Sequence, residues 1–338
     1  MRIFRSLEEV PRDFGTTIAT VGNFDGVHCG HQQVVGEVVR RARETGNKAV
    51  AVTFDPHPLR ILRPDVAPRL ITPQKVKERL MSELGLDALV VVPFTRDFSI
   101  TSAEDFVRHI LCDKLHAREV HEGENFHFGH KAQGTPERLA EMGQELGFAV
   151  KIYPVMMLRG NPVSSSHIRR LLLEGKVARA RRLLGHVFSV TAAPGRGRGL
   201  GHKYTVPTIN LSRYDELTPG NGVYITRTRV GDELFDSVTN VGNRPTFGDD
   251  SFAIETHLLN FHPLEVTAQT EVEIFFERWR RPEAKFPSAE ALREQIGRDV
   301  QRARRYFALA GKTTSTTEAQ RHGEEATHVR IESQPKGL

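Results

Sequence analysis

Apolar residues between positions 17 and about 155 form short continuous runs separated by amphipathic stretches. Such runs are typical of strands buried on both faces of a parallel sheet, and they span residues 18–21, 49–54, 88–94 and 149–155. After the first run, apolar residues at 34, 35, 38, 39 and 42 recur at the spacing of one helix face. Because strands and helices alternate, the pattern predicts an α/β domain with a doubly wound parallel sheet, whose ligands bind beyond the carboxyl ends of the strands.

Three more helices have readable starts. Thr72 and Pro73 precede an apolar-periodic run, Ser102 stands three residues before an acidic residue as in a capping box, and Thr135 precedes a proline. These signals predict helices that begin near residues 73, 103 and 136. Glycine at 147 is expected to end the last of them.

The pattern changes after residue 185. Alternating or β-branched segments at 188–192, 223–230, 234–239, 254–259 and 272–276 predict short strands, and Gly231-Asp232 is a candidate two-residue hairpin turn. Regularly spaced short strands indicate an antiparallel barrel or sandwich. Ser288 is expected to cap a terminal helix whose apolar face is listed as Leu292, Ile296, Val300, Ala303 and Phe307.

We therefore expect a first domain over residues 1–185, a β-barrel domain with a terminal helix over 186–310, and a polar, disordered tail over 311–338. The length of 338 residues agrees with two domains. With 38% hydrophobic and 26% charged residues the chain can form real cores, which excludes a disordered protein.

The net charge of +5 suits anionic substrates such as ATP, but it also suits RNA. A total of two cysteines argues against a disulfide scaffold. Because a free thiol at Cys29 would be exposed to oxidation, a reducing cytoplasm is the simplest assumption. The N-terminus lacks the apolar core of a signal peptide, and no window approaches 18 apolar residues, so we expect no membrane span.

Candidate chemistry begins where the first strand ends. Glycines at 22 and 26 interrupt regular structure, the helical pattern starts at Gly30, and His28 and His31 lie between them. Free N–H groups at a helix N-terminus favour a phosphate. Two imidazoles add hydrogen bonds to oxygens on which charge develops.

Other stretches have weaker signals. Residues 54–58 hold two prolines, which predicts a rigid, non-helical loop. Aromatic residues in the glycine-bounded segment 123–129 suit a planar ring. The stretch 194–203, rich in glycine and arginine, could wrap a phosphate, bind RNA or serve as a solvated linker.

In the form Asn-Phe-Asp-Gly-Val-His-x-Gly-His, residues 23–31 resemble the HxGH motif of prokaryotic bifunctional riboflavin kinase/FMN adenylyltransferases. The resemblance implies that His28 and His31 are catalytic. It assigns nucleotide binding to Gly22, Asn23, Phe24, Asp25, Gly26 and Gly30. Ser164, Ser165 and Ser166 ahead of Arg169 are similar to the second phosphate motif of the nucleotidyltransferase superfamily. This similarity implies that the start of the helix at these serines, together with Arg169, holds the triphosphate.

The same resemblance implies a flavin site. Phe54, Pro56, His57 and Pro58 match a segment that lines the adenylyl-transfer site, and Asn125, Phe126 and Phe128 match a flavin-packing loop. Family members commonly have Asp where this chain has Asn125, so a charged role at this position is not expected.

In the second domain, residues 205–210 resemble the Pro-Thr-Ala-Asn motif of riboflavin kinases, which implies that Thr208 and Asn210 help to bind Mg²⁺. Here Ile209 replaces the usual Ala, and Thr205-Val206 replaces Gly-Phe. The resemblance also implies a catalytic carboxylate at Glu255. It assigns nucleotide contacts to Gly199, Gly201 and Lys203, and flavin contacts to Asn243, Arg244 and Thr246.

The sequence thus predicts a cytoplasmic transferase that uses ATP with Mg²⁺ to convert riboflavin to FMN and FMN to FAD. Flavins are then substrate and product. No nucleic-acid or membrane partner is expected, and the chain is expected to be a monomer or a weak homo-oligomer. Two alternatives stay open at this point: a nucleotide-binding or RNA-binding protein that uses its Gly-Arg stretch, and an adenylyltransferase whose kinase half is impaired by the departures at 205–209.

Overall fold

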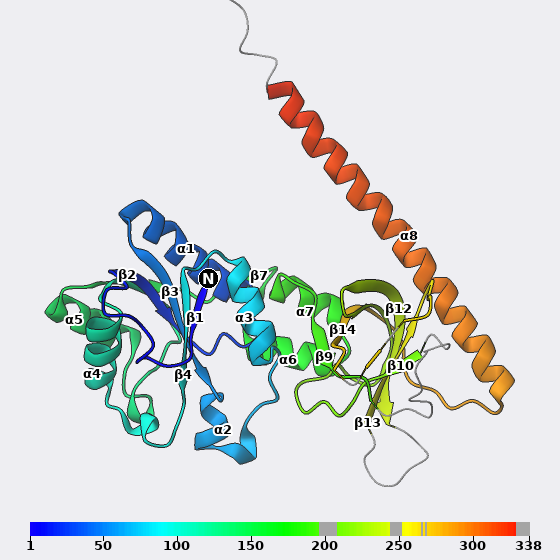
Figure 1. Ribbon diagram of the computed structural model, residues 1–338, viewed down its shortest axis with the longest axis horizontal. Helices are drawn as coiled ribbons and strands as arrows, with labels where there is room; N and C mark the ends of the chain where they lie inside the picture. Colours follow the sequence, from blue (N-terminus) through cyan, green and yellow to red (C-terminus); the bar gives the residue numbers. More distant parts are fainter. Residues whose placement is uncertain (196–207, 244–251, 265, 268, 329–338) are drawn as a thin grey trace, which may run out of the picture. The chain divides into compact units, whose positions relative to one another are not determined.

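The computed structural model describes residues 1–195, 208–243, 252–264, 266–267 and 269–328. It forms two units (Figure 1). The first comprises Met1–Phe188 with Asp215–Thr218, and the second comprises Ser189–Tyr214 with Pro219–Leu338. The division falls close to the boundary near residue 185 at which the sequence pattern changes.

The first unit is built on a six-stranded sheet with the order β1-β4-β3-β2-β5-β6. Every pairing in it is parallel. The strands are β1 Arg2–Phe4, β2 Thr17–Val21, β3 Lys48–Asp55, β4 Ala88–Pro93, β5 Ala117–Gly123 and β6 Ala149–Tyr153. The chain order reverses between β2 and β5, so the topological switch point lies there, where ligands bind in open α/β sheets.

Helices cover both faces of this sheet, which confirms the predicted doubly wound fold. Strand residues alternate between the two faces: Ile18 of β2 packs with α1 and α3 residues, whereas Ala19 and Val21 pack with residues of the 106–115 helix and of α5. The helical segments of the unit are α1 Cys29–Thr45, α2 Pro58–Leu62, η1 Pro64–Val66, α3 Gln74–Glu83, η2 Phe98–Ile100, α4 Ala103–Asp105, η3 Phe106–Lys114, η4 His130–Ala132, α5 Pro136–Leu146, α6 Ser165–Leu173 and α7 Val177–Leu184. A short hairpin, β7 Met157–Leu158 and β8 Asn161–Pro162, precedes α6.

Side-chain caps confirm two of the predicted helix starts. Ser102 Oγ accepts the N–H of Asp105, and Thr135 Oγ1 accepts the N–H of Arg138. The start predicted near residue 73 is confirmed as well, since α3 begins at Gln74 with Pro73 at its N-cap. The prolines of 54–58 do not exclude a helix as expected, because α2 begins at Pro58. Proline is well suited to the first helical position, where its missing N–H needs no partner.

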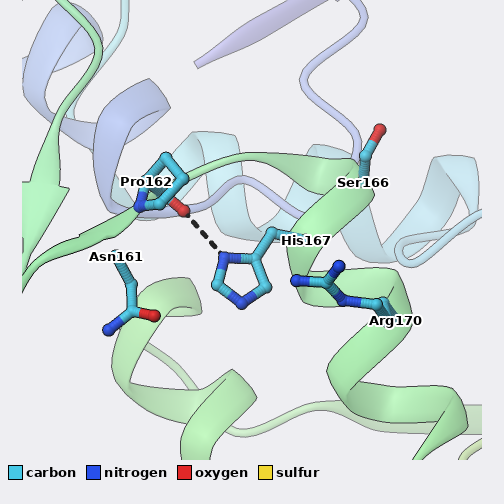
Figure 2. A pocket seen from close by; sticks show the side chains of 5 residues that line it. All are labelled: Asn161, Pro162, Ser166, His167 and Arg170. Atoms are coloured by element: carbon cyan, nitrogen blue, oxygen red, sulfur yellow. Dashed lines mark hydrogen bonds between the residues drawn. The ribbon is translucent and has the colours of Figure 1, made fainter.

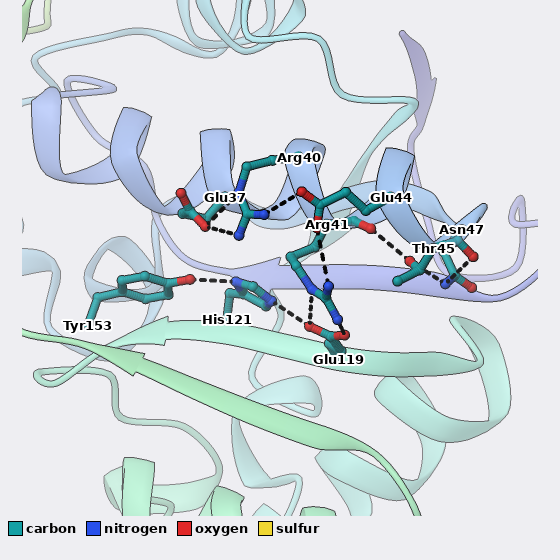
Figure 3. Close-up of polar contacts among 9 residues, drawn as sticks. All are labelled: Glu37, Arg40, Arg41, Glu44, Thr45, Asn47, Glu119, His121 and Tyr153. Carbon is teal, nitrogen blue, oxygen red and sulfur yellow. Dashed lines mark hydrogen bonds and ion pairs between the residues drawn. The ribbon is translucent and has the colours of Figure 1, made fainter.

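Strand β5 has no counterpart in the predicted strands because charged and polar residues interrupt it. Figure 3 shows where these side chains lie: His121 is fully buried and bonds Tyr153 Oη at 2.8 Å and Glu119 at 3.2 Å. Arg41 of α1 reaches across and donates to Glu119, with Nε to Oε2 at 3.1 Å. The polar residues of β5 are thus paired with α1 and β6, a tertiary effect that sequence periodicity does not report.

The second unit is a six-stranded antiparallel sheet with the order β10-β13-β12-β11-β14-β9. The strands are β9 Ser189–Ala192, β10 Thr208–Asn210, β11 Gly222–Val230, β12 Glu233–Asn243, β13 Phe252–Leu258 and β14 Val272–Arg281. Gly231, at φ +58°, turns β11 into β12 as the hairpin signal predicts.

The edge strands β9 and β10 meet just past their ends. Gly195 N donates to Asn210 O at 2.7 Å and Ser212 N donates to Ala193 O at 2.9 Å, so the sheet curls onto itself. A side chain on Gly195 would lie 2.7 Å from Leu211 O, which explains glycine at this close approach. This arrangement confirms an antiparallel barrel-type domain.

The terminal helix α8, Ala289–His328, packs through Ala303 and Phe307 against Ile225 and Leu259. The predicted apolar face is wrong in its first half, since Leu292 and Ile296 are each 42% exposed. The helix also continues past residue 311, where the composition predicts a disordered tail. Disorder of residues 311–338 in solution stays a prediction, and residues 329–338 lie outside the described part of the chain. None of the helices that the structure describes is long and apolar enough to cross a membrane.

Candidate active sites

The turn between β2 and α1 places two histidine rings in contact. His28 is the N-cap of α1, and its Nδ1 accepts the N–H of His31 at 3.3 Å. The two rings stack with centroids 3.6 Å apart and 14° between their planes, and the edge of Phe24 packs against His31 at 5.3 Å. Phe24 and Val27 have φ values of +47° and +40°, which are unusual for residues other than glycine. Backbone strain of this kind is concentrated at functional sites.

Both imidazoles are held in the neutral form. Burial lowers the pKa of His28 to about 4 and lowers the pKa of His31 well below its usual value of 6.5. A neutral ring still has one N–H to donate. In addition, His31 Nδ1 is buried without a hydrogen-bond partner among the described residues. A buried polar atom without a partner is costly, so this nitrogen is suited to a ligand.

Asp25 joins the two phosphate motifs that the sequence predicts. Its Oδ1 accepts the N–H groups of Ile71 at 2.9 Å and Thr72 at 3.0 Å, and its Oδ2 accepts from Arg169 Nη2 at 2.6 Å. Ser165 Oγ donates to the Asp25 carbonyl at 2.8 Å. The turn 22–31 and the start of α6 therefore lie together. The carboxylate of Asp25 braces the turn against these protein groups, and its nucleotide contact stays a prediction.

The start of α6 has the geometry of a phosphate site. Ser164 is the N-cap, with Oγ accepting the N–H of His167 at 3.3 Å, and Ser166 is exposed. Figure 2 shows an open pocket beside it, lined by Asn161, Pro162, Ser166, His167 and Arg170. His167 bonds the Pro162 carbonyl at 3.1 Å, which ties the helix start to the β7–β8 hairpin.

The two segments predicted to contact flavin are joined by a row of aromatic rings. Phe54 packs edge-on against Phe94 at 5.7 Å, and Phe126 stacks on Phe128 at 5.2 Å. The rings between them are Phe98 and Phe106. Phe128 is only 6% exposed and packs in the core against Phe126, and its flavin contact stays a prediction. Phe126 is half-buried and Asn125 is exposed, and for these two a flavin contact stays a prediction.

His57 lies at the N-terminus of α2, where its Nδ1 accepts the N–H of Leu59 at 3.2 Å. Burial is the main cause that lowers the pKa of His57. The Asp55–Pro56 peptide bond is cis. The segment 54–58 connects the end of β3 at Asp55 to the start of α2 at Pro58.

Two buried ionisable residues at this edge were missed from the sequence. Lys77 of α3 is 4% exposed, and Glu122 at the end of β5 is 3% exposed and accepts the N–H of Val21 at 2.6 Å. Burial lowers the pKa of Lys77 and raises the pKa of Glu122 well above its usual value. For Lys77 a signal was present in the sequence, because this residue occupies the buried face of α3 together with Val76 and Met81. For Glu122 the sequence offers none, because β5 itself was not predicted.

In the second unit, strand register brings the predicted kinase residues together. Asn210 of β10 stands opposite Glu255 of β13, and Thr208 stands opposite His257, with Thr208 Oγ1 and His257 Nδ1 at 3.2 Å. Burial lowers the pKa of His257. Ile209, between the two predicted metal ligands, is 1% exposed and so points into the core, as strand alternation predicts.

The remaining site predictions fall where the structure gives no side-chain information. Gly199, Gly201, Lys203, Arg244 and Thr246 lie outside the described residues, as do Thr205 and Val206, and Asn243 is described only as the end of β12. Among the described side chains, no group of three or more His, Cys, Asp or Glu residues could hold a metal ion.

The parallel sheet, its histidine-bearing turn and the adjacent helix start define the class of HxGH nucleotidyltransferase-like domains, here followed by an antiparallel barrel. Two family models match the chain: FAD synthetase over residues 10–167 and riboflavin kinase over residues 184–307. Bifunctional riboflavin kinase/FMN adenylyltransferase is the name of a relative from Buchnera aphidicola that is 30% identical over 91% of this chain and 100% of its own length. A Listeria monocytogenes relative of the same name is 34% identical over 86% of this chain and 92% of its own length.

This chain belongs to the family of bifunctional riboflavin kinase/FMN adenylyltransferases. A solved structure named as a macrolide-efflux protein from Streptococcus pneumoniae has the same fold, with a TM-score of 0.76 at 23% identity over 90% of this chain and 98% of that one. At that identity the likeness concerns the fold alone.

Proposed function

We propose that this chain makes both flavin cofactors: the second unit phosphorylates riboflavin with ATP to FMN, and the first unit transfers AMP from ATP to FMN to give FAD and pyrophosphate. Family membership and the two matched models support the pair of reactions. The observation that carries the first reaction is the stacked, neutral His28–His31 pair with an unbonded Nδ1, beside the start of α6.

In the adenylyl transfer, a phosphate oxygen of FMN attacks the α-phosphorus of ATP, and the bond to the β-phosphate oxygen breaks. The attacking oxygen is already anionic, so no general base is needed. Negative charge grows on the α-phosphoryl oxygens and on the leaving pyrophosphate. Neutral imidazole N–H groups of His28 and His31 stabilise that charge by hydrogen bonds, and the start of α6 receives the phosphates of ATP.

In the kinase reaction, the terminal hydroxyl of the ribityl chain attacks the γ-phosphorus of ATP. Glu255 accepts the hydroxyl proton as general base, and ADP leaves. The register of Asn210 opposite Glu255 between β10 and β13 supports a base close to the proposed Mg²⁺ ligands.

The donor set of β10 fits Mg²⁺ that arrives with ATP. Thr208 and Asn210 offer neutral oxygens, and Mg²⁺ characteristically takes few protein ligands while phosphates and water supply the others. When bound, the ion neutralises charge on the phosphates. We place both reactions in the cytoplasm, where riboflavin, FMN and ATP are the partners and the free thiol of Cys29 stays reduced.

A product time course tests the proposal. Purified chain incubated with riboflavin, ATP and Mg²⁺ is expected to form FMN first and FAD afterwards, and incubation with FMN is expected to yield FAD and pyrophosphate in equal amounts. Chromatography of the flavins with a pyrophosphate assay measures both. If neither substrate is converted by folded protein, the proposal is wrong.

A further inference from the structure

Lys77 is a buried cation for which the protein supplies little compensation. It lies on α3 next to Val76, at 4% exposure, and its Nζ donates to Thr53 Oγ1 at 3.4 Å. Within the described part of the chain this is the one hydrogen bond of the ammonium group, which has three donors, and no carboxylate lies within ion-pair distance of it. Burying a charge without a paired anion is strongly unfavourable. The position therefore needs an explanation.

The ammonium group lies among the elements of the first active site. Thr53, its partner, ends the buried part of β3 and donates to the carbonyl of Asn23 in the histidine turn at 3.3 Å. The charge of Lys77 is close enough to lower the pKa values of His31 and His57. Lys77 thus reaches from α3 to Thr53 near the carboxyl end of β3, and Thr53 is bonded to the turn 22–31.

The other charged groups around Lys77 do not neutralise it. Asp25 and Asp55 raise its pKa through their charges, with Glu78 contributing less, but burial outweighs them and lowers the pKa overall. Asp25 already pairs with Arg169, and Glu78 pairs with Arg5. The unbonded donors of Lys77 and the unbonded Nδ1 of His31 are two unfilled polar groups at one edge of the sheet.

The proposed reaction brings anions to that edge. An FMN phosphate must approach the α-phosphate of ATP, and two anions in a water-poor site repel strongly. A buried ammonium with unfilled donors is suited to phosphate oxygens, as a compact point charge. We propose that Lys77 is a catalytic residue of the adenylyl transfer, with its ammonium group in contact with the phosphate oxygens of the two reacting substrates. This inference rests on the proposed function of the first unit.

Three variants of the full-length chain test the inference. Lys77→Met keeps an unbranched side chain and removes the charge, Lys77→Arg keeps the charge, and Lys75→Met removes an exposed lysine of the same helix as a control. For Lys77→Met we expect kcat for FAD formation from FMN to fall about 10²-fold, as for loss of one preorganised donor. The KM values are expected to change far less, because the charge acts most strongly in the transition state. Riboflavin phosphorylation is expected to stay within twofold of wild type.

Thermal stability separates a functional lysine from a structural one. Removing an uncompensated buried charge is expected to leave Tm unchanged or to raise it, so Lys77→Met combines low FAD synthesis with undiminished Tm. Lys77→Arg is expected to regain part of the rate, and Lys75→Met to match wild type. The inference is overturned if Lys77→Met makes FAD at the wild-type rate, or if it loses Tm together with both activities. Failure of the proposed function has a different signature, since wild type and Lys75→Met would then make no FAD from FMN.

Discussion

Removal of the Asp25 carboxylate is expected to loosen the first active site. In the structure this group accepts two backbone N–H groups, from Ile71 and Thr72, and pairs with Arg169, whose side chain is only 17% exposed. Asp25→Ala leaves these donors unpaired. Breaking a buried ion pair by removing one partner costs about 3–5 kcal/mol. At about 2–4 °C per kcal/mol for a unit of this size, the first unit is expected to unfold roughly 6–20 °C lower.

Hydrogen exchange gives the sharper measurement. The amides of Ile71 and Thr72 are expected to exchange about 10²–10⁴ times faster in Asp25→Ala, because a loss of about 3–5 kcal/mol corresponds to that factor when exchange proceeds by opening of the site. The exposed Asp13→Ala serves as the control. Wild-type exchange at both amides, together with an unchanged unfolding temperature, would refute the view that Asp25 braces the turn.

Three further predictions follow from the sites. His28→Ala and His31→Ala are each expected to cut FAD formation about 10²–10³-fold while FMN formation from riboflavin persists, as flavin chromatography will show. Thr208→Ala and Glu255→Gln are expected to abolish riboflavin phosphorylation but not FMN adenylylation, and a Mg²⁺ titration is expected to rescue Thr208→Ala in part and Glu255→Gln not at all. Burial raises the pKa of Glu122 above its usual value of 4.5 in the folded protein, so Glu122 ionises at a lower pH in the unfolded chain than in the folded one. The folding stability that is present below pH 4.5 is therefore lost in part as the pH rises. Glu122→Gln is expected to remove that loss, measured by urea unfolding at pH 5 and pH 8.

Local signals in the sequence were sufficient to predict most of the sheet and the histidine turn of the first unit. Continuous apolar runs identified β2, β3 and β4, because strands covered on both faces leave few polar positions. The run at 149–155 also identified β6, but the expectation that it is buried on both faces was wrong, because β6 is an edge strand with exposed and half-buried residues. The histidine turn was found because glycines, a strand end and a helix start coincide within ten residues. The structure agrees with the predicted strand–turn–helix arrangement, because His28 is the N-cap of α1.

Residues that depend on distant partners could not be predicted in the same way. Asp25 has the sequence context of a phosphate ligand, yet its partners lie 46, 47 and 144 positions away along the chain. Lys77 was not singled out in the sequence, yet α3 buries it to 4% exposure. The apolar face of α8 was correct at Val300, Ala303 and Phe307, which pack against Ile225 and Leu259, but not at Leu292 and Ile296, which are exposed.

Mixing two variants, each of which lacks one of the two activities, tests most directly the claim that two independent sites act in sequence. His31→Ala is expected to stop at FMN, and Glu255→Gln is expected to use FMN but not riboflavin, so neither alone turns riboflavin into FAD. Equal amounts of the two proteins with riboflavin, ATP and Mg²⁺ are predicted to form FAD, because FMN released by the first is a substrate for the second. A mixture that forms no FAD, while wild type does and each variant keeps its own partial reaction, would contradict the account.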